Sequence, residues 1–236
     1  MIRPIAAVPP NRYGMAMVPL SFCGHDMLAL ADGALFWPRH RALLIADLHL
    51  EKASFLASYG QPLPPYDSLA TLERLEALAV QTAPARIYCL GDSFHDRQGP
   101  SRLDPAVAAR LCAMADAVDW IWITGNHDIG ASGFPGGRVC VEEVLDGVCL
   151  RHEAIPADPR PEISGHWHPK LRIRVRGRSV SRRCFVRSAS KLVLPAFGSF
   201  TGGLDAGHPA LMAAMGGTAE ALVPLPDRLL RFAIAA

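Results

Sequence analysis

Acidic, amide and histidine side chains directly follow several apolar runs of this sequence, and this placement restricts the fold more than any other feature. The runs are 41–46, 86–90, 120–124, 148–151 and 162–164. Short apolar runs bounded by polar residues predict buried strands. In α/β sheets, binding groups collect at the carboxyl ends of strands, because the loops there converge on one crevice. The sequence therefore predicts a layered α/β protein with one polar centre.

The elements between these runs support that fold class. Leucines 69, 72, 75 and 78 form one stripe of a helix that begins at Asp67 or Ser68 and stops at Pro84, and a second helix opens at Asp104-Pro105. A hairpin is expected over 27–37, and further strands over 171–176, 183–186 and 192–194. Strands and helices alternate early and strands dominate later, which predicts an α/β sandwich, parallel first and antiparallel afterwards.

The domain organisation is expected to be simple. We predict a flexible arm at residues 1–20 and a single domain over 21–236, with a mobile glycine-rich loop at 130–137. The six cysteines contain no CxxC pair and suggest buried thiols in a reducing compartment. The sequence shows neither the continuous apolar stretch of a signal peptide nor the ~18 apolar residues of a membrane span, so we expect a cytoplasmic protein without a membrane partner.

The polar residues after the strands have the chemistry of metal ligands. Asp47 and His49 form one Asp-x-His pair, and His166 and His168 form a His-x-His pair. In an extended strand end, residues i and i+2 point the same way, so each pair can grip one ion. Carboxylate, amide and imidazole ligands without thiolate suit manganese, iron or zinc. A carboxylate such as Asp92 can bridge two ions ~3.5 to 4 Å apart.

The order of these motifs carries a family resemblance. DLH at 47–49, GDSFH at 91–95, GNHD at 125–128, a lone His152 and GHWH at 165–168 together resemble the five motifs of the binuclear metallophosphoesterase superfamily. The segments DLHLEKASFLASYGQPLPPYDS, GHWHPKLRIRVRGRSVSRRCF and LPAFGSFTGG are similar to the bacterial ligase-associated DNA damage response endonucleases.

This resemblance implies both a fold and an activity. The fold would be a metallophosphoesterase-type β-sandwich of two mixed sheets flanked by helices, in α/β/β/α layers. The activity would be a manganese-dependent endonuclease that cleaves single-stranded DNA in DNA repair by two-metal activation of a bridging hydroxide, with zinc or iron as other possible ions. A DNA helicase and an ATP-dependent DNA ligase would be its functional partners.

The resemblance also implies roles for individual residues. His127 would donate a proton to the leaving oxygen or stabilise the transition state. Metal one would take Asp47, His49, Asp92 and His168, and metal two would take Asp92, Asn126, His152 and His166. Beside these, we expect Asp128 to orient its neighbours and Trp167 to pack in the core; Phe94, Phe197 and Phe200 either pack or stack on bases.

His95 separates two classes of phosphoesterase. Monoesterases of the superfamily commonly carry an aspartate three residues after the bridging aspartate, whereas this chain has His95. A histidine there favours phosphodiester cleavage, with His95 as a further catalytic group at the scissile phosphate. The alternative is a surface histidine followed by Asp96.

A basic segment follows the last histidine motif. Residues 170–187 hold seven arginines, one lysine and no acid, a local charge of +8 in a chain whose net charge is +2, so the remainder carries −6. Arginines at 172, 174 and 176 alternate with Ile173 and Val175, which predicts a strand with one basic face. The residues expected to hold a phosphate backbone are Arg172, Arg174, Arg176, Arg178, Arg182 and Arg183. The alternative is an edge strand charged against aggregation.

Two other functions compete with the nuclease. One is a small-molecule phosphodiesterase or phosphatase of the same superfamily, which the basic segment and His95 disfavour. The other is a non-catalytic scaffold, which should have lost ligands, whereas all seven ligand positions are intact.

Overall fold

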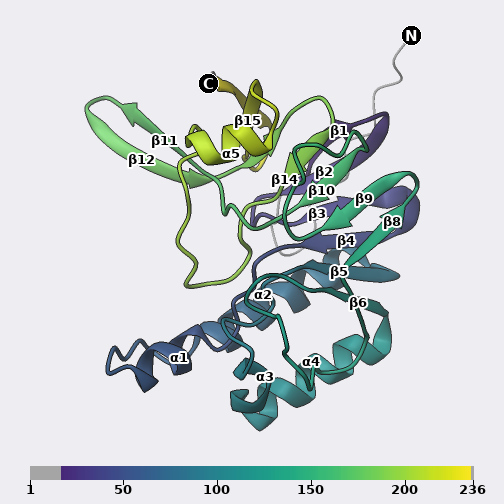
Figure 1. Ribbon diagram of the computed structural model, residues 1–236, viewed down its shortest axis with the longest axis vertical. Coiled ribbons are helices and arrows are strands. Elements are labelled where there is room, and N and C mark those ends of the chain that lie inside the picture. Colours follow the sequence, from purple (N-terminus) through teal and green to yellow (C-terminus); the bar gives the residue numbers. More distant parts are fainter. Residues whose placement is uncertain (1–16, 235–236) are drawn as a thin grey trace.

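The computed structural model describes residues 17–234, and these form two seven-stranded sheets and a separate two-stranded ribbon (Figure 1). The strand order of the first sheet follows the order of the strands in the chain. Its first four strands pair antiparallel and its last four pair parallel. In order, they are β1 (Met17–Phe22), β2 (His25–Leu30), β3 (Leu35–Trp37), β4 (Ala42–Ile45), β5 (Arg86–Leu90), β6 (Asp119–Ile123) and β7 (Arg138–Cys140).

The second sheet is mainly antiparallel, with β10 as the exception, because it pairs parallel to both of its neighbours. Its spatial order is β16-β15-β13-β14-β10-β9-β8. The strands are β8 (Glu142–Leu145), β9 (Val148–Arg151), β10 (Glu162–Ser164), β13 (Phe185–Arg187), β14 (Lys191–Val193), β15 (Ala219–Pro224) and β16 (Leu229–Ile234).

The core lies between the two sheets. Alternate residues of each strand face inward, so Trp37 and Tyr88 of the first sheet share one apolar cluster with Ile163 and Phe185 of the second. All four side chains are buried. The two sheets therefore form a sandwich.

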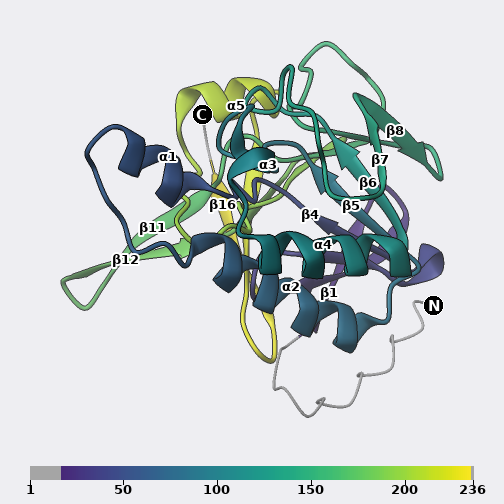
Figure 2. The same cartoon turned by 90° about the horizontal axis from the view of Figure 1, so that it is seen from below.

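Helices cover the outer faces of this sandwich. α2 (Asp67–Thr82) and α4 (Pro105–Ala117) lie side by side on the first sheet, and their leucines pack with Ile87 and Trp120 (Figure 2). α5 (Pro209–Ala214) packs its Leu211 onto the second sheet. The predicted α/β/β/α layering is confirmed. The short elements are η1 (Pro38–His40), α1 (Lys52–Ser58) and α3 (Gly99–Arg102).

One predicted helix cap is confirmed and the other is wrong. The Asp104 carboxylate accepts from Ala106 N at 2.8 Å at the start of α4. At α2, neither Asp67 nor Ser68 caps the helix, because both side chains bond back toward α1. Asp67 accepts from Ala53 N at 2.9 Å, and Ser68 donates to the Glu51 carboxylate at 2.8 Å.

Other predicted features differ in extent. β1 begins at Met17, so residues 17–20 of the predicted arm belong to a strand, while the rest of the arm lies outside the described residues. The division into an arm and a single domain stays a prediction, as does the mobility of the loop at 130–137. Of the six free thiols, those at 89, 149 and 184 are buried, but Cys23 is exposed.

The basic segment forms a hairpin that projects from the body of the molecule (Figure 1). β11 (Lys170–Val175) and β12 (Arg178–Arg183) pair only with each other among the described strands. They are joined by Arg176 and Gly177, whose φ values of 49° and 78° suit a tight two-residue hairpin turn. Arg176 therefore lies in the turn and not on the predicted strand.

Candidate metal centre

The candidate ligands follow strands of both sheets and meet at one edge of the sandwich. The first sheet supplies Asp47, His49, Asp92 and Asn126 after β4, β5 and β6, and the second sheet supplies His152, His166 and His168 after β9 and β10. The structure thus brings the predicted ligand residues close together.

Asp47, His49 and His168 form the first donor group, in which one donor atom from each lies within 4.8 Å of the others. The His49 and His168 Nε2 atoms are 3.2 Å apart, and His168 Nε2 lies 3.4 Å from Asp47 Oδ1. Asp47 and His49 are buried. Three donor atoms thus face one point.

Asp92, His152 and His166 form the second donor group. His152 Nε2 lies 3.4 Å from Asp92 Oδ2 and 3.1 Å from His166 Nδ1. The amide oxygen of Asn126 completes the group, at 2.9 Å from His152 Nε2 and 3.1 Å from His166 Nδ1.

Asp92 lies between the two groups. Its Oδ2 atom is also 3.9 Å from His49 Nε2, and its Oδ1 atom accepts from His127 N at 2.9 Å. A carboxylate in this position can bridge two ions.

The donor chemistry fits two divalent cations. His152 Nδ1 must donate to the Leu90 carbonyl, 3.0 Å away, so its Nε2 lone pair points at the second group. Ring nitrogens of His166 and His168 likewise converge with the oxygen and nitrogen atoms of the other candidate ligands, as donor atoms around a cation do. Burial lowers the pKa of His49 to about 2, which keeps the ring neutral as ligation requires. Oxygen and imidazole donors without thiolate suit manganese, iron or zinc.

Most of these residues have a left-handed backbone conformation instead of an extended one, and this conformation directs their side chains toward the donor groups. The φ values are 53° at Asp47, 44° at His49, 46° at Asp92, 71° at His166 and 46° at His168. Such values are uncommon for residues other than glycine and cost on the order of 1–3 kcal/mol each. The extended-strand argument was therefore wrong, and His166 and His168 face different groups instead of gripping one ion.

Glycines beside the ligands allow the ligand-bearing loops to pack closely together, a role that was not predicted from the sequence. A Cβ on Gly125 would overlap the Asp92 carboxylate, and one on Gly165 would lie 2.7 Å from Asp47 Oδ2. The available signal was a glycine immediately before Asp92, Asn126 and His166.

Asp128 connects two ligand-bearing loops, as predicted. Its carboxylate accepts from Ser93 N, Phe94 N and Gly125 N, each at 3.1 Å. Asp128 is 1% exposed, and burial raises the pKa of its carboxyl. This buried carboxylate fixes the loops after β5 and β6 relative to each other.

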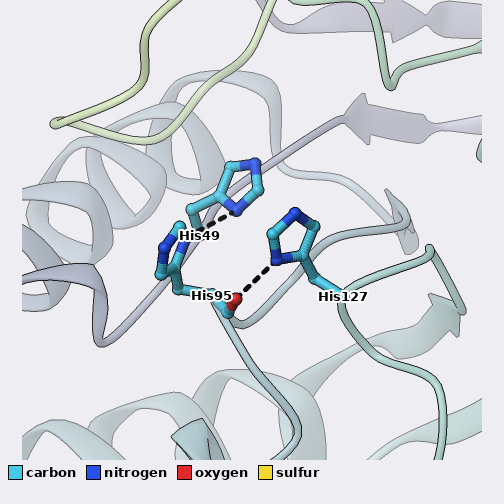
Figure 3. Close-up of side chains that lie close together, drawn as sticks. All are labelled: His49, His95 and His127. Carbon is cyan, nitrogen blue, oxygen red and sulfur yellow. Dashed lines mark hydrogen bonds between the residues drawn. The ribbon is translucent and has the colours of Figure 1, made fainter. Parts of the chain in front are cut away.

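His49, His95 and His127 form a third cluster beside the first donor group (Figure 3). His95 Nδ1 is 3.3 Å from His49 Nδ1, and the His95 and His127 rings stack with centroids 5.2 Å apart. His127 Nδ1 donates to the His95 carbonyl at 2.6 Å, which leaves Nε2 facing Asp92 Oδ2 at 4.0 Å. Burial lowers the pKa of His95 to about 4. Both histidines thus border the metal centre.

Two of the three phenylalanines considered for base stacking are packed inside the protein. Phe94 and Phe197 are fully buried, and Trp167 packs against the outer cluster of the second sheet, as expected. Phe200 is exposed.

The basic side chains of the ribbon do not all lie on one face. Arg172 and Arg174 lie opposite Ser181 and Ser179, whereas Arg182 pairs with Leu171 and so lies on the other face. The Arg183 guanidinium is engaged elsewhere, since it donates to the Gly198 carbonyl at 2.6 Å. The exposed arginines are Arg172, Arg174, Arg176, Arg178 and Arg182.

A binuclear metallophosphoesterase is the class of protein that this sandwich and these donor groups define. Residues 40–170 match the calcineurin-like phosphoesterase family, and the chain belongs to this family. Members of the family use a binuclear metal centre. No curated protein matched the chain.

A solved nuclease structure has the same fold. A Pseudomonas putida nuclease named MPE is 33% identical, with a TM-score of 0.70, and the match covers 92% of this chain and 100% of that one. The E. coli phosphoesterase Yfce is 17% identical, with a TM-score of 0.39, and the match covers 82% of this chain and 98% of that one. None of the helices within residues 17–234 is long and apolar enough to cross a membrane.

Proposed function

We propose that this phosphoesterase is a metal-dependent endonuclease that cleaves single-stranded DNA in DNA repair. The observation that carries the proposal is the pair of donor groups joined by Asp92, with His127 at their border. The 33% identity to a nuclease and the exposed arginines beside His168 favour a nucleic acid over a small phosphate ester.

The two donor groups would hold two divalent ions, with manganese as the preferred one. Asp47, His49 and His168 would bind the first ion, Asn126, His152 and His166 the second, and Asp92 both. When bound, such ions lower the pKa of a water and neutralise charge on the attacked phosphate.

His127 would act as the general acid. Its Nδ1 proton is committed to the His95 carbonyl, so its Nε2 atom is the one that can carry a proton toward the departing sugar oxygen. A 3′ or 5′ alkoxide is a poor leaving group, so proton donation is worth ~100- to 10,000-fold in rate.

His95 would contact the scissile phosphate as a neutral donor. If His49 binds an ion through Nε2, its Nδ1 carries the proton and donates to His95 Nδ1, 3.3 Å away. The proton of His95 is then on Nε2, on the far side of its ring. A neutral donor there can hold a phosphate oxygen without competing for the ions.

The ribbon would hold the DNA backbone. β11 begins at Lys170, two residues after His168, so backbone bound along the exposed arginines leads directly to the metal centre. Each phosphate neutralised by such a contact makes binding more sensitive to salt. The proposed setting is the cytoplasm, together with a DNA helicase and an ATP-dependent DNA ligase.

The decisive experiment offers manganese, zinc and magnesium with single-stranded DNA, duplex DNA and nucleotide monoesters. We expect manganese-dependent cleavage of single-stranded DNA, and activity confined to monoesters would refute the proposal.

A second experiment tests the ribbon. In a plot of the logarithm of the DNA-binding constant against the logarithm of the salt concentration, replacing Arg174 and Arg176 by glutamine should reduce the steepness of the slope by ~1 to 2. An unchanged slope would show that the ribbon does not contact DNA.

A further inference from the structure

A cavity of about 670 Å³ adjoins the second donor group. Asn126 and His152 line this cavity and also belong to that group. Its volume lies in the range of ligand pockets, ~300–1,000 Å³. A molecule bound to the ions through a phosphate would therefore have this cavity directly beside it.

The walls of the cavity expose apolar side chains. Ile129 is 72% exposed, Val141 is 75% exposed and Ile155 is 47% exposed, and all three line the cavity. They come from three separate loops, after β6, β7 and β9. Apolar groups gathered around a concave site, with polar groups at its edge, are typical of a ligand pocket.

The charged groups at the rim of the cavity do not favour a phosphate there. Glu142 and Glu153 both line it, and Glu153 is more than half exposed. The Arg151 guanidinium is buried and already paired with Asp158 at 2.9 Å and Glu142 at 3.2 Å. The arginine of the lining is therefore not free to hold a backbone phosphate, whereas the Glu142 and Glu153 carboxylates can accept hydrogen bonds from an uncharged planar group.

We infer that this cavity binds the nucleobase of a nucleotide next to the scissile phosphate; this inference rests on the proposed nuclease function. The ribbon projects on the opposite side of the molecule from β8 and β9, which contribute Glu142 and Arg151 to the cavity lining (Figure 1). A single strand would thus have its backbone on the ribbon, its scissile phosphate at the donor groups and one base in the cavity. A base in a duplex is stacked and paired, so this arrangement selects unpaired DNA.

The test removes the base and the cavity wall in turn. The substrate is an end-labelled single strand of twelve thymidines, intact or with one central abasic residue, and the manganese-loaded enzyme is assayed for the rate at each bond. The variant I129S/V141S removes two apolar walls. V80S is the matched control, because Val80 is 68% exposed and lies on α2, outside the cavity lining.

We expect wild-type enzyme and V80S to cut one of the two bonds flanking the abasic residue about tenfold more slowly than in the intact strand, because the contact made by one base is lost. I129S/V141S should cut all bonds about tenfold more slowly and lose its sensitivity to the abasic residue. If that variant melts well below wild type, Ile155→Ser replaces it.

Two results would overturn the inference: wild-type rates that ignore the missing base, or an abasic penalty that persists unchanged in I129S/V141S. Hydrolysis of bis(p-nitrophenyl) phosphate without cleavage of any oligonucleotide is a distinct outcome, because it refutes the nuclease function itself.

Discussion

Replacing Asp128 should loosen the metal centre without removing any candidate ligand. This carboxylate accepts three backbone hydrogen bonds and joins the loop that carries Asp92 to the loop that carries Asn126. In Asp128→Asn, the remaining oxygen can still accept from Ser93 and Gly125, but the new amide group faces the Phe94 N–H.

The expected loss follows from these contacts. One buried donor left without an acceptor costs ~1–3 kcal/mol, so Asp128→Asn should lower the free energy of unfolding by about 2 kcal/mol. Asp128→Ala leaves three such donors, but it also removes the desolvation cost of a buried carboxylate, so we expect a loss of about 3–4 kcal/mol.

The assay is urea unfolding followed by circular dichroism in EDTA, with manganese affinity measured separately by calorimetry. Both variants should bind manganese more weakly because their ligand loops are less fixed. Asp116→Asn, an exposed aspartate of α4, is the control and should match wild type. An Asp128→Asn variant within 0.5 kcal/mol of wild type in stability, with unchanged manganese affinity, would refute the reasoning.

Three further predictions concern neighbouring groups. His127→Ala should lower the rate of DNA cleavage ~100- to 10,000-fold without changing the metal content measured by mass spectrometry. Loss of metal in this variant would show instead that His127 is a ligand. Gly125→Ala should lower the melting temperature and manganese affinity because its Cβ overlaps Asp92, whereas Gly202→Ala, which has open space, should not. The Arg102 guanidinium lowers the pKa of Asp96, so Asp96→Asn should cost about 0.5–1 kcal/mol at pH 7, and unfolding curves should show this difference shrinking below pH ~4 and vanishing once the pH is below the folded pKa.

The sign of the last effect follows from linkage. A carboxyl whose pKa is lowered by folding contributes stability above its unfolded pKa of ~3.9 and loses it as the pH falls through the folded value. A difference that grew on acidification would contradict the assigned role of the Asp96–Arg102 pair.

The strands that position the site were predictable because they are apolar and end in polar motifs. Runs such as 86–90 and 120–124 match β5 and β6 almost residue for residue. β12, by contrast, was not expected as a strand, because only Val180 among its six residues is apolar, and it pairs along its whole length with β11.

The other differences between prediction and structure arise from contacts between segments that are distant in sequence. Asp67 and Ser68 look like helix caps locally, but their side chains bond instead to the preceding segment, Asp67 to the backbone N–H of Ala53 and Ser68 to the Glu51 carboxylate. Asp47 and His49 adopt a left-handed backbone in which their N–H groups donate to the carbonyls of Gly91 and Asp92, and no local pattern encodes this contact with a distant loop. Arg183 resembles its basic neighbours in sequence, but it reaches the carbonyl of Gly198.

Each donor group draws side chains from both sheets. Asp47 and His49 come from the first sheet and His168 from the second, and the other group is divided in the same way. An ion held by either group would act as a clasp across the open edge of the sandwich. Removing the ions with a chelator should then lower the melting temperature of the whole sandwich, because a ligand bound only by the folded state stabilises that state.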